Sequence, residues 1–349
     1  MKTALVTGSG GLIGSACVAR LCREGWAVTG IDNNLRAWFF GPGGSTASTV
    51  AALRRDWPQY IHSTLDLRDR SAVCDLVAGL RPDLIIHTAA QPSHDRAAAI
   101  PAEDFDVNAV GTLNLLLAAH ENSPEAPFCF TSTNKVYGDR PNHLPLRELP
   151  ARYDYADGRD GIDEQMPVDQ CLHSLFGASK LAADVLCQEY GRYFGMPIGI
   201  FRGGCLTGPQ HAGVALHGFL NYLVRCAVQG LPYTVYGYRG KQVRDQIHAA
   251  DVASLFLQFC EAPRAGEVYN LGGGRANSLS ILEALAALRA RGLVLQTSYR
   301  DTPRIGDHIC YISDLRKLHS HFPHWQLEYP LSRILDEMVT HMSGRRAAA

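Results

Sequence analysis

Glycines near the N-terminus recur at the spacing of a phosphate-binding turn. Gly8, Gly11 and Gly14 lie three residues apart, between an apolar run at 3–7 and a segment of helical spacing at 12–23. Such a turn needs backbone freedom, a side chain at its middle glycine would block a pyrophosphate, and the last glycine lets the helix pack closely. The N–H groups that open the helix then face the phosphates. The spacing therefore predicts a dinucleotide site, with a glycine-rich turn that binds nothing as the alternative. The predicted contacts are Gly8, Gly10, Gly11, Leu12, Ile13 and Gly14.

Carboxylates that follow the next apolar runs are placed to bind the nucleoside. Asp32 ends the run at 27–31, where it can accept hydrogen bonds from an adenosine ribose and would repel a 2′-phosphate. This favours NAD over NADP, unless Asp32 is only a turn residue and the nearby Arg36 accommodates a phosphate. Asp66 and Leu67 fall where an adenine contact is expected, although Asp66 is nearly as good a helix cap. The remaining predicted cofactor contacts are Asn33, Ala89 and Lys180.

Short apolar runs and longer segments of helical spacing alternate through residues 1–203. This repetition predicts a parallel sheet covered on both faces, that is, a doubly wound α/β (Rossmann) domain that binds NAD. From about residue 204 the alternation is looser, so residues 204–349 are expected to form a smaller substrate-binding lobe at the carboxyl edge of the sheet, interleaved with the first domain. Strands are expected at 3–7, 27–31, 84–90 and 128–132, and helices at 12–23, 107–120, 175–194 and 217–229.

Two segments depart from this alternation. Glycine and proline at 41–44 predict that residues 30–58 form a loop, and the aromatic side chains of Trp38, Phe39 and Phe40 suggest that it packs on a neighbour. Residues 141–167 are rich in Asp, Arg and Pro, and we expect them to be irregular.

Composition and charge argue against several kinds of protein. The 349 residues are 46% hydrophobic and 19% charged, with a formal net charge of −1 and no long basic run, which disfavours nucleic acid binding. The ten cysteines are scattered without a CxxC pair, which indicates a reducing, cytoplasmic setting. No apolar run is long enough to cross a membrane. His319 and His321 lack further ligands at suitable spacing, and no HxxxH or HExxH pair occurs, so no metal is expected.

Four further motifs follow the glycine turn along the chain. They are Thr-Ser-Thr-Asn-Lys-Val-Tyr-Gly-Asp at 131–139, Gly-Ala-Ser-Lys at 177–180, Gly-Lys-Gln-Val-Arg-Asp-Gln-Ile-His at 240–248 and Arg-Ile-Gly-Asp at 304–307. With the glycine spacing and Asp32, they resemble the extended short-chain dehydrogenase/reductase family of NAD-dependent epimerases and dehydratases over nearly the whole chain. Within that family, the first and third motifs and the His173-Ser174 pair look most like the CDP-paratose (CDP-tyvelose) 2-epimerases.

The resemblance implies that bound NAD takes hydride from a sugar carbon and returns it to the other face of the ketone. In the family, a tyrosine removes the hydroxyl proton, and a lysine four residues later lowers the pKa of that tyrosine and holds the nicotinamide ribose. A serine or threonine binds the reacting hydroxyl. Lys180 and Thr133 match the lysine and the hydroxyl residue, but Phe176 occupies the tyrosine position. Loss of a general base typically costs about 10²–10⁴ in rate.

Three explanations of Phe176 are open. First, another group is the base. His94 follows the fourth predicted strand, and histidine titrates near neutrality, although a loop histidine without a role is an equal alternative. Tyr137, His173 and Cys205 are further candidates. Second, the phenylalanine is an engineered replacement that traps a complex. Third, the chain binds dinucleotide and sugar without oxidising anything.

The resemblance also assigns residues to a nucleotide-sugar substrate. Arg244 and Arg304 match arginines that bind the diphosphate through their guanidinium groups, with two surface salt bridges as the alternative. Cys205 falls at a small polar contact, with inert packing as the alternative. The predicted substrate contacts are His94, Thr133, Asn134, His173, Cys205, Arg244 and Arg304.

The implied activity is epimerisation at C2 of a nucleotide-activated sugar. A 4-epimerase or dehydratase acting on a related sugar nucleotide, and a binding protein without redox activity, are the alternatives. The resemblance further implies a homodimer that pairs through the helix at 107–120 and the helix that carries Lys180.

Overall fold

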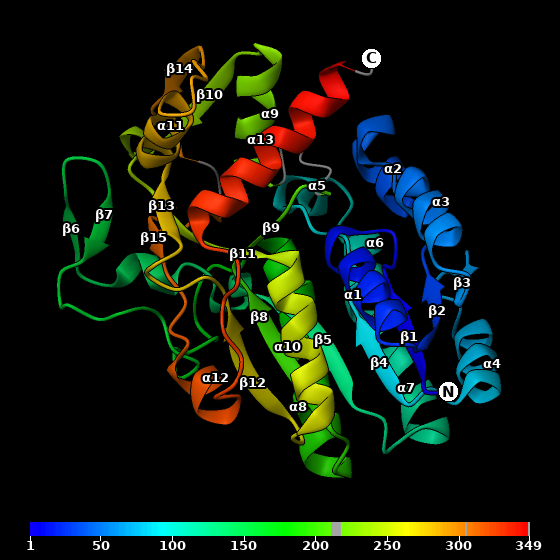
Figure 1. Ribbon diagram of the computed structural model, residues 1–349. Coiled ribbons are helices and arrows are strands. Elements are labelled where there is room, and N and C mark those ends of the chain that lie inside the picture. The colour runs from blue at the N-terminus through cyan, green and yellow to red at the C-terminus, as the bar shows by residue number, and fades with distance from the viewer. Residues whose placement is uncertain (211–217, 304–305, 348–349) are drawn as a thin grey trace.

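Seven parallel strands form the central sheet, with helices on both faces (Figure 1). The computed structural model describes residues 1–210, 218–303 and 306–347. The strand order is β12-β8-β5-β4-β1-β2-β3, so the direction of winding reverses between β1 and β4. The doubly wound fold predicted from the sequence is therefore confirmed. The strands are β1 (Thr3–Thr7), β2 (Ala27–Ile31), β3 (Tyr60–Ser63), β4 (Leu84–His87), β5 (Phe128–Thr133), β8 (Ile198–Gly203) and β12 (Glu267–Leu271).

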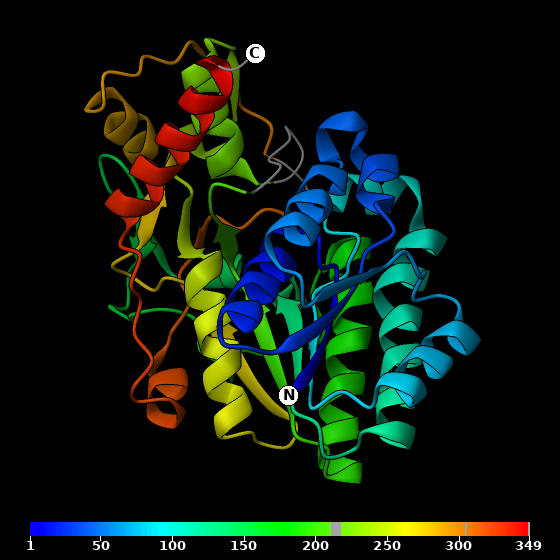
Figure 2. The ribbon, with the colours of Figure 1, turned by 45° about the vertical axis from the view of Figure 1, so that its right-hand side comes forward.

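Each face of the sheet is covered by its own set of helices and its own apolar core, because a central parallel strand is apolar on both sides. Figure 2 separates the two layers: α1 and α10 lie on one side of the sheet, and α7 and α8 on the other. The first layer comprises α1 (Leu12–Arg23), α3 (Ala47–Asp56) and α10 (Ala249–Glu261), and the second comprises α4 (Arg70–Leu80), α7 (Gly111–Asn122) and α8 (Ser174–Phe194).

The segment at 30–58, predicted to be a loop, is mostly helical, so that prediction was wrong. It contains α2 (Leu35–Phe40), a 3₁₀ turn η1 (Pro42–Gly44) and α3. Glycine and proline interrupt the chain only between the helices, whereas the residues of α3 are mostly good helix formers and bury Leu53 against the core beside α1. The aromatic residues do pack: Phe39 is buried, and the guanidinium of Arg96 lies over the Trp38 ring.

Two other element boundaries differ from the prediction. The fourth strand ends at His87, three residues earlier than expected, and residues 88–90 turn along the carboxyl edge of the sheet. The helix expected at 107–120 begins with a π-helical turn, η2 (Asp106–Val110), before α7. In that turn the buried Asn108 side chain accepts from the Gln91 N–H and donates to the Gln91 carbonyl oxygen and to Ser179 Oγ. A π-turn of this kind is often found at functional sites.

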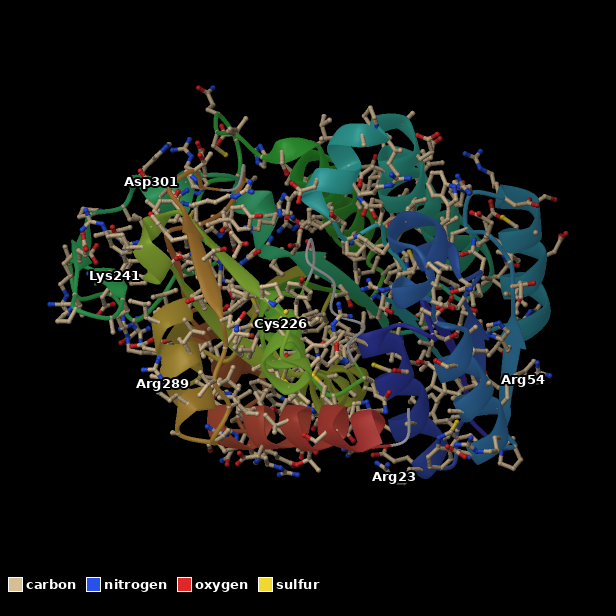
Figure 3. The ribbon with its side chains drawn as sticks, turned by 90° about the horizontal axis from the view of Figure 1, so that it is seen from above. Arg23, Arg54, Cys226, Lys241, Arg289 and Asp301 are labelled. Carbon is tan, nitrogen blue, oxygen red and sulfur yellow. The ribbon has the colours of Figure 1, made fainter. Side chains whose placement is uncertain are left out.

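The second half of the chain forms a lobe over the carboxyl edge of the sheet, and it returns to the sheet through α10 and β12. Figure 3 looks down on the lobe, with the buried Cys226 of α9 near the centre of the view. Arg23 at the end of α1 and Arg54 in α3 mark the N-terminal part of the chain, on the right. The lobe contains β9 (Cys205–Thr207), β10 (Tyr233–Tyr236), β11 (Val243–His248), β13 (Ser278–Ser280), β14 (Thr297–Arg300), β15 (Cys310–Tyr311), α9 (Phe219–Gln229), α11 (Ile281–Arg289) and α13 (Leu331–Ala347). The short helix α12 (Arg316–His321) instead packs beside β12 (Figure 1), and its Leu318 belongs to the core of the central sheet.

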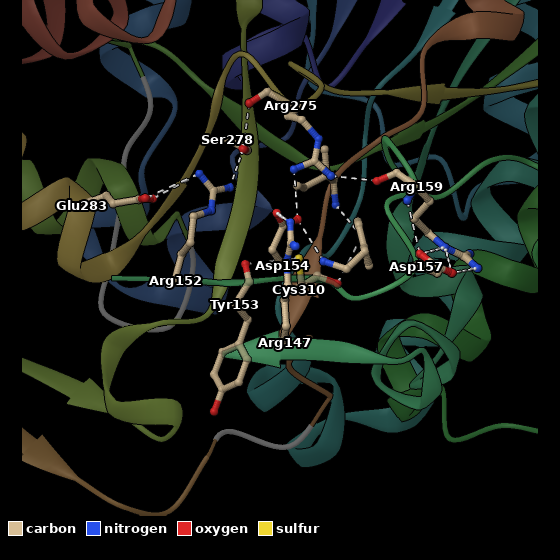
Figure 4. A network of polar contacts seen from close by, with 12 residues as sticks. Arg147, Arg152, Tyr153, Asp154, Asp157, Arg159, Arg275, Ser278, Glu283 and Cys310 are labelled. Atoms are coloured by element: carbon tan, nitrogen blue, oxygen red, sulfur yellow. Dashed lines mark hydrogen bonds and ion pairs between the residues drawn. The ribbon is translucent and has the colours of Figure 1, made fainter. Parts of the chain in front are cut away.

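The segment at 141–167 is largely irregular, as expected, but it includes a short hairpin of β6 (Leu146–Glu148) and β7 (Tyr153–Tyr155). Arginine–carboxylate contacts anchor this hairpin to the lobe (Figure 4). Asp154 accepts from Arg147 and from Arg275, and Arg152 donates to Ser278 Oγ. No helix in the described part of the chain is long and apolar enough to span a bilayer.

His87, at the end of β4, gives a prediction about acid stability. Its buried ring lies 2.6 Å from Thr7 Oγ1 and 2.9 Å from Thr112 Oγ1, and burial, with a smaller effect of Lys180, lowers its pKa to about 3. An unfolded histidine titrates near pH 6.5, so between these values the unfolded chain binds one more proton and acid favours unfolding. We compare the free energy of unfolding of the wild type with that of His87→Gln. We expect the wild type to lose about 2 kcal/mol relative to the variant between pH 7 and pH 5.

Urea unfolding of both proteins at the two pH values measures this difference. His324→Gln, which changes an exposed histidine, serves as the control and should show a difference that does not vary with pH. A pH-independent difference for His87→Gln would mean that the His87 imidazole has the same pKa in the folded and in the unfolded chain.

Candidate active site

A cleft of about 420 Å³ lies at the carboxyl edge of the sheet, where the winding reverses and the lobe closes over it. This is the place at which open α/β sheets bind ligands. Every predicted cofactor contact except Gly14 lines the cleft, and Gly14 lies behind the turn. Of the predicted substrate contacts, His94, Thr133, Asn134, Cys205 and Arg244 line it; Arg304 lies outside the described residues.

The glycine turn has room for phosphates only because side chains are missing from it. Gly8 adopts a φ of +67°, and a Cβ there would lie 2.8 Å from the Ala89 nitrogen. A Cβ at Gly14 would overlap the carbonyl oxygen of Gly8. Gly11 caps α1 without a side chain, so the first N–H groups of the helix open toward the cleft. The turn therefore fits the pyrophosphate of a dinucleotide.

The Asp32 carboxylate joins the glycine turn to the segment that follows β2. Its Oδ2 accepts from the Gly10 N–H at 2.9 Å, and its Oδ1 accepts from the Asn34 N–H at 2.9 Å and from Thr46 Oγ1 at 2.8 Å. These bonds hold a negative charge at the cleft wall, where it disfavours a 2′-phosphate and can accept from ribose hydroxyls. Thr46 was not singled out from the sequence, because its contact with Asp32 depends on the fold of 30–58.

A polar cluster lines the cleft beyond β3. Asp66 accepts from Arg68 Nη2 at 2.7 Å and from Asn33 Nδ2 at 3.0 Å. Hydrogen bonds from Arg68 hold the pKa of Asp66 below its usual range. Asp66 does not cap α4, because Asp69 does so by accepting from the Ala72 N–H. Asp66 and Leu67 thus both remain at the cleft wall.

Thr133, Phe176 and Lys180 line the middle of the cleft, at the end of β5 and on the first turns of α8. The Lys180 ammonium is buried over the Phe130 ring, 4.2 Å from its centroid, and donates to the Thr131 carbonyl oxygen at 2.9 Å. Burial lowers the pKa of Lys180 to about 8. Phe176 and Lys180 are one helical turn apart, as in the family, but the phenyl ring offers no atom that can exchange a proton.

Two of the four candidate replacements for the tyrosine line the cleft. The His94 ring meets the edge of Phe176, with 5.0 Å between the ring centroids, and its Nδ1 lies 2.9 Å from Ser174 Oγ. Cys205 lies on the lobe side of the cleft, where burial raises the pKa of its thiol to about 11. A thiol in that state is inert as a base near neutrality.

The other two candidates, Tyr137 and His173, are not among the cleft-lining side chains of the described residues. The Tyr137 hydroxyl is buried and donates to Asn270 Oδ1 at 2.8 Å, and burial raises its pKa to about 12. His173 Nε2 lies 2.9 Å from the Val136 carbonyl oxygen. Both side chains therefore fix the segment after β5 against its neighbours.

The lobe contributes the polar groups at the far end of the cleft. Arg244 on β11 is buried, and its Nη2 donates to Asp307 Oδ1 at 2.5 Å. Two residues along β11, Gln246 lines the cleft with both amide atoms buried and without a hydrogen-bond partner among the described residues. Gln246 belongs to the sequence motif at 240–248, but the motif alone does not predict that its side chain lies near Arg244 without a hydrogen bond. In the described part of the chain, no group of three or more His, Cys, Asp or Glu side chains could hold a metal ion.

Comparisons with known proteins agree with this arrangement. The model of the NAD dependent epimerase/dehydratase family matches residues 4–272. CDP-paratose 2-epimerase from Salmonella typhi is 30% identical over 322 residues, which cover 90% of this chain and 91% of the relative. dTDP-glucose 4,6-dehydratase from Neisseria meningitidis is 30% identical over 339 residues, 91% and 87% of the two chains. UDP-glucose 4-epimerase from Thermus thermophilus, solved with NAD, superposes with a TM-score of 0.78 at 26% identity, covering 98% of this chain and 99% of that structure.

Proposed function

This chain belongs to the NAD dependent epimerase/dehydratase family, and on that premise we propose that it inverts C2 of a nucleotide-activated sugar. It is an NAD-dependent enzyme, and the family resemblance seen in its motifs is confirmed. The observation that carries the proposal is one continuous cleft. The glycine turn and Asp32 lie at one end, Thr133 and Lys180 in the middle, and Arg244 under the lobe at the other end.

Different residues of the cleft would bind the cofactor and the substrate. The glycine turn would hold the pyrophosphate of NAD, Asp32 the adenosine ribose, and Lys180 the nicotinamide ribose. When bound, NAD supplies reversible oxidation of an alcohol carbon. Thr133 would orient the reacting hydroxyl, and Arg244 would exchange its bond to Asp307 for the substrate diphosphate, which a guanidinium binds bidentately. Asn134 and Cys205, also on the cleft wall, are proposed as sugar contacts.

C2 is proposed as the reacting carbon because the Salmonella typhi relative named as a 2-epimerase matches over nine tenths of both chains. The dehydratase from Neisseria meningitidis is equally identical, so reaction at C4 is the second candidate. Phe176 favours a third: a protein that binds NAD and a sugar nucleotide without oxidising the sugar.

One experiment distinguishes the three. The purified protein with NAD is incubated in D₂O with a panel of CDP-, UDP- and dTDP-sugars, and products are identified by NMR. We expect inversion at C2 without deuterium uptake there, because a hydrogen carried on the cofactor does not exchange with solvent. Inversion at C4 or a 4-keto-6-deoxy product would replace the C2 assignment. Tight binding without any product from the panel would favour the binding protein. Lys180→Met is the inactive control.

The homodimer stays a prediction. Tyr193 and Val185 on α8 are large apolar side chains that are 80% and 42% exposed, which favours contact through this helix.

A further inference from the structure

We propose that His94, oriented by Ser174, is the general base that replaces the missing tyrosine. This inference rests on the proposed redox epimerisation and adds to it the group that takes the hydroxyl proton. It starts from a contact that the sequence does not show: residues 94 and 174 are 80 positions apart, yet His94 Nδ1 and Ser174 Oγ lie 2.9 Å from each other.

The backbone that carries His94 is held firmly. Gln91 bonds with its N–H and its carbonyl oxygen to the Asn108 side chain, and its own amide group accepts from the Ser93 N–H and donates to the Ser93 carbonyl oxygen. Ser93 Oγ then caps α5 (His94–Ala99), of which His94 is the first residue. Gln91, Ser93 and Asn108 are all buried. A base must be placed within a few tenths of an ångström, and this clamp provides such placement.

Ser174 is fixed by the start of α8. It adopts a φ of +63°, an unfavourable conformation for serine, at the start of α8. Its Oγ accepts from the Gly177 N–H, in addition to its contact with His94. Strain of this kind is retained where the surroundings over-determine it, which is common at active sites. If Oγ also accepts from Nδ1–H, the lone pair of the imidazole is on Nε2.

The His94 ring lies beside Phe176, the residue at the family's tyrosine position. The two rings form a T-shaped pair, and Phe176 is one helical turn from Lys180. His94 lines the cleft together with Thr133. Phenylalanine therefore has a packing role here: it contacts the imidazole ring without competing for the proton.

The other titratable groups around this position are less suited. Lys180 donates to the Thr131 carbonyl oxygen, so its ammonium is already engaged in the way that ribose binding requires. Lys135, from the turn after β5, donates to the Gly306 carbonyl oxygen. His308 is fully buried and contacts the Gly138 carbonyl oxygen through Nε2, and burial lowers its pKa well below the usual value. His308 is near enough to His94 for the two imidazoles to interact electrostatically.

The proposed step is balanced in protons and electrons. The O–H bond of the substrate hydroxyl breaks and its proton goes to Nε2, which turns the imidazole into an imidazolium. The carbon loses its hydrogen with the bonding electron pair to oxidised nicotinamide, the oxidant supplied by the proposed function. When the ketone is reduced on its other face, the imidazolium returns the proton to the oxygen.

The test compares His94→Gln, Phe176→Tyr and the double variant with the wild type. We expect His94→Gln to lower kcat at least about 100-fold while the Kd of NAD and of the nucleotide sugar change less than about threefold, because a general base contributes about 10²–10⁴. The double variant should regain activity, since tyrosine restores the family's base beside Lys180. His94→Gln with kcat within threefold of an active wild type would overturn the proposal. A wild type inactive on every sugar would count instead against the proposed function.

A second measurement does not depend on turnover. The ¹⁵N chemical shifts of the His94 imidazole, assigned by their loss in His94→Gln, report which nitrogen carries the proton. We expect the Nδ1–H form in the wild type and a mixture of tautomers in Ser174→Ala. Melting temperatures of the variants check that each is folded. If the tautomer in the wild type is Nε2–H, or if Ser174→Ala leaves it unchanged, Ser174 does not position the base.

Discussion

Gly14→Ala is expected to weaken NAD binding by at least about 100-fold, or about 2.7 kcal/mol. A Cβ at this position would overlap the carbonyl oxygen of Gly8, the residue that opens the turn. Because both clashing atoms belong to the backbone or are fixed to it, neither can rotate away, and the turn must open. Isothermal titration of the purified protein with NAD measures the effect. Retention of wild-type affinity would mean that the turn does not hold the pyrophosphate.

Gly79→Ala is the matched control for this substitution. Gly79 lies within α4, and a Cβ there would have no heavy atom within 4 Å. Alanine is the better helix former by about 1 kcal/mol, so this variant should bind NAD normally and melt at a slightly higher temperature. The pair separates the loss of a specific turn from the general effect of adding a methyl group.

Arg202→Met is expected to lower the free energy of unfolding by about 3–5 kcal/mol, because it leaves a buried charge without its partner. Asp184 on α8 is fully buried, and it accepts from Arg202 Nε at 3.1 Å and from Nη2 at 2.9 Å. Asp184 also accepts from the hydroxyl of Ser132, which directly precedes Thr133 at the end of β5. The variant should therefore also lose activity, since β8 is no longer tied to α8, the helix that carries Lys180. Denaturant unfolding followed by circular dichroism measures the stability change.

Arg55→Met serves as the control for the loss of one arginine charge. Arg55 forms an ion pair with Asp56 at 2.7 Å, but the two side chains are 73% and 50% exposed. Exposed pairs contribute less than about 1 kcal/mol, so this substitution should leave unfolding almost unchanged. Equal losses for the two variants would show that burial of the Arg202–Asp184 pair is not what makes it important.

The features of this protein that depend on local sequence are the ones that could be predicted. The helix at Leu12–Arg23 and the strands at Thr3–Thr7 and Ala27–Ile31 have the predicted bounds, because local periodicity and turn residues determine them. The glycine turn and Asp32 follow from the same local chemistry, and the four-residue spacing of Phe176 and Lys180 on one helix face does too. The helices at 35–56 were missed, because glycine and proline at 41–44 hid the helix formers on either side.

The amino-acid sequence alone therefore determined the doubly wound fold, the preference for NAD and the absence of a phenolic base at position 176. Only the tertiary structure brought His94 and Ser174 to the side of Phe176. His94, Ser174 and Phe176 come together because parallel strands end at one edge of the sheet, and the segments after β4 and before α8 both return to that edge. The same holds for Arg244 and Asp307, 63 residues apart. Contacts of this kind depend on long-range packing, and no spacing within a short segment encodes them.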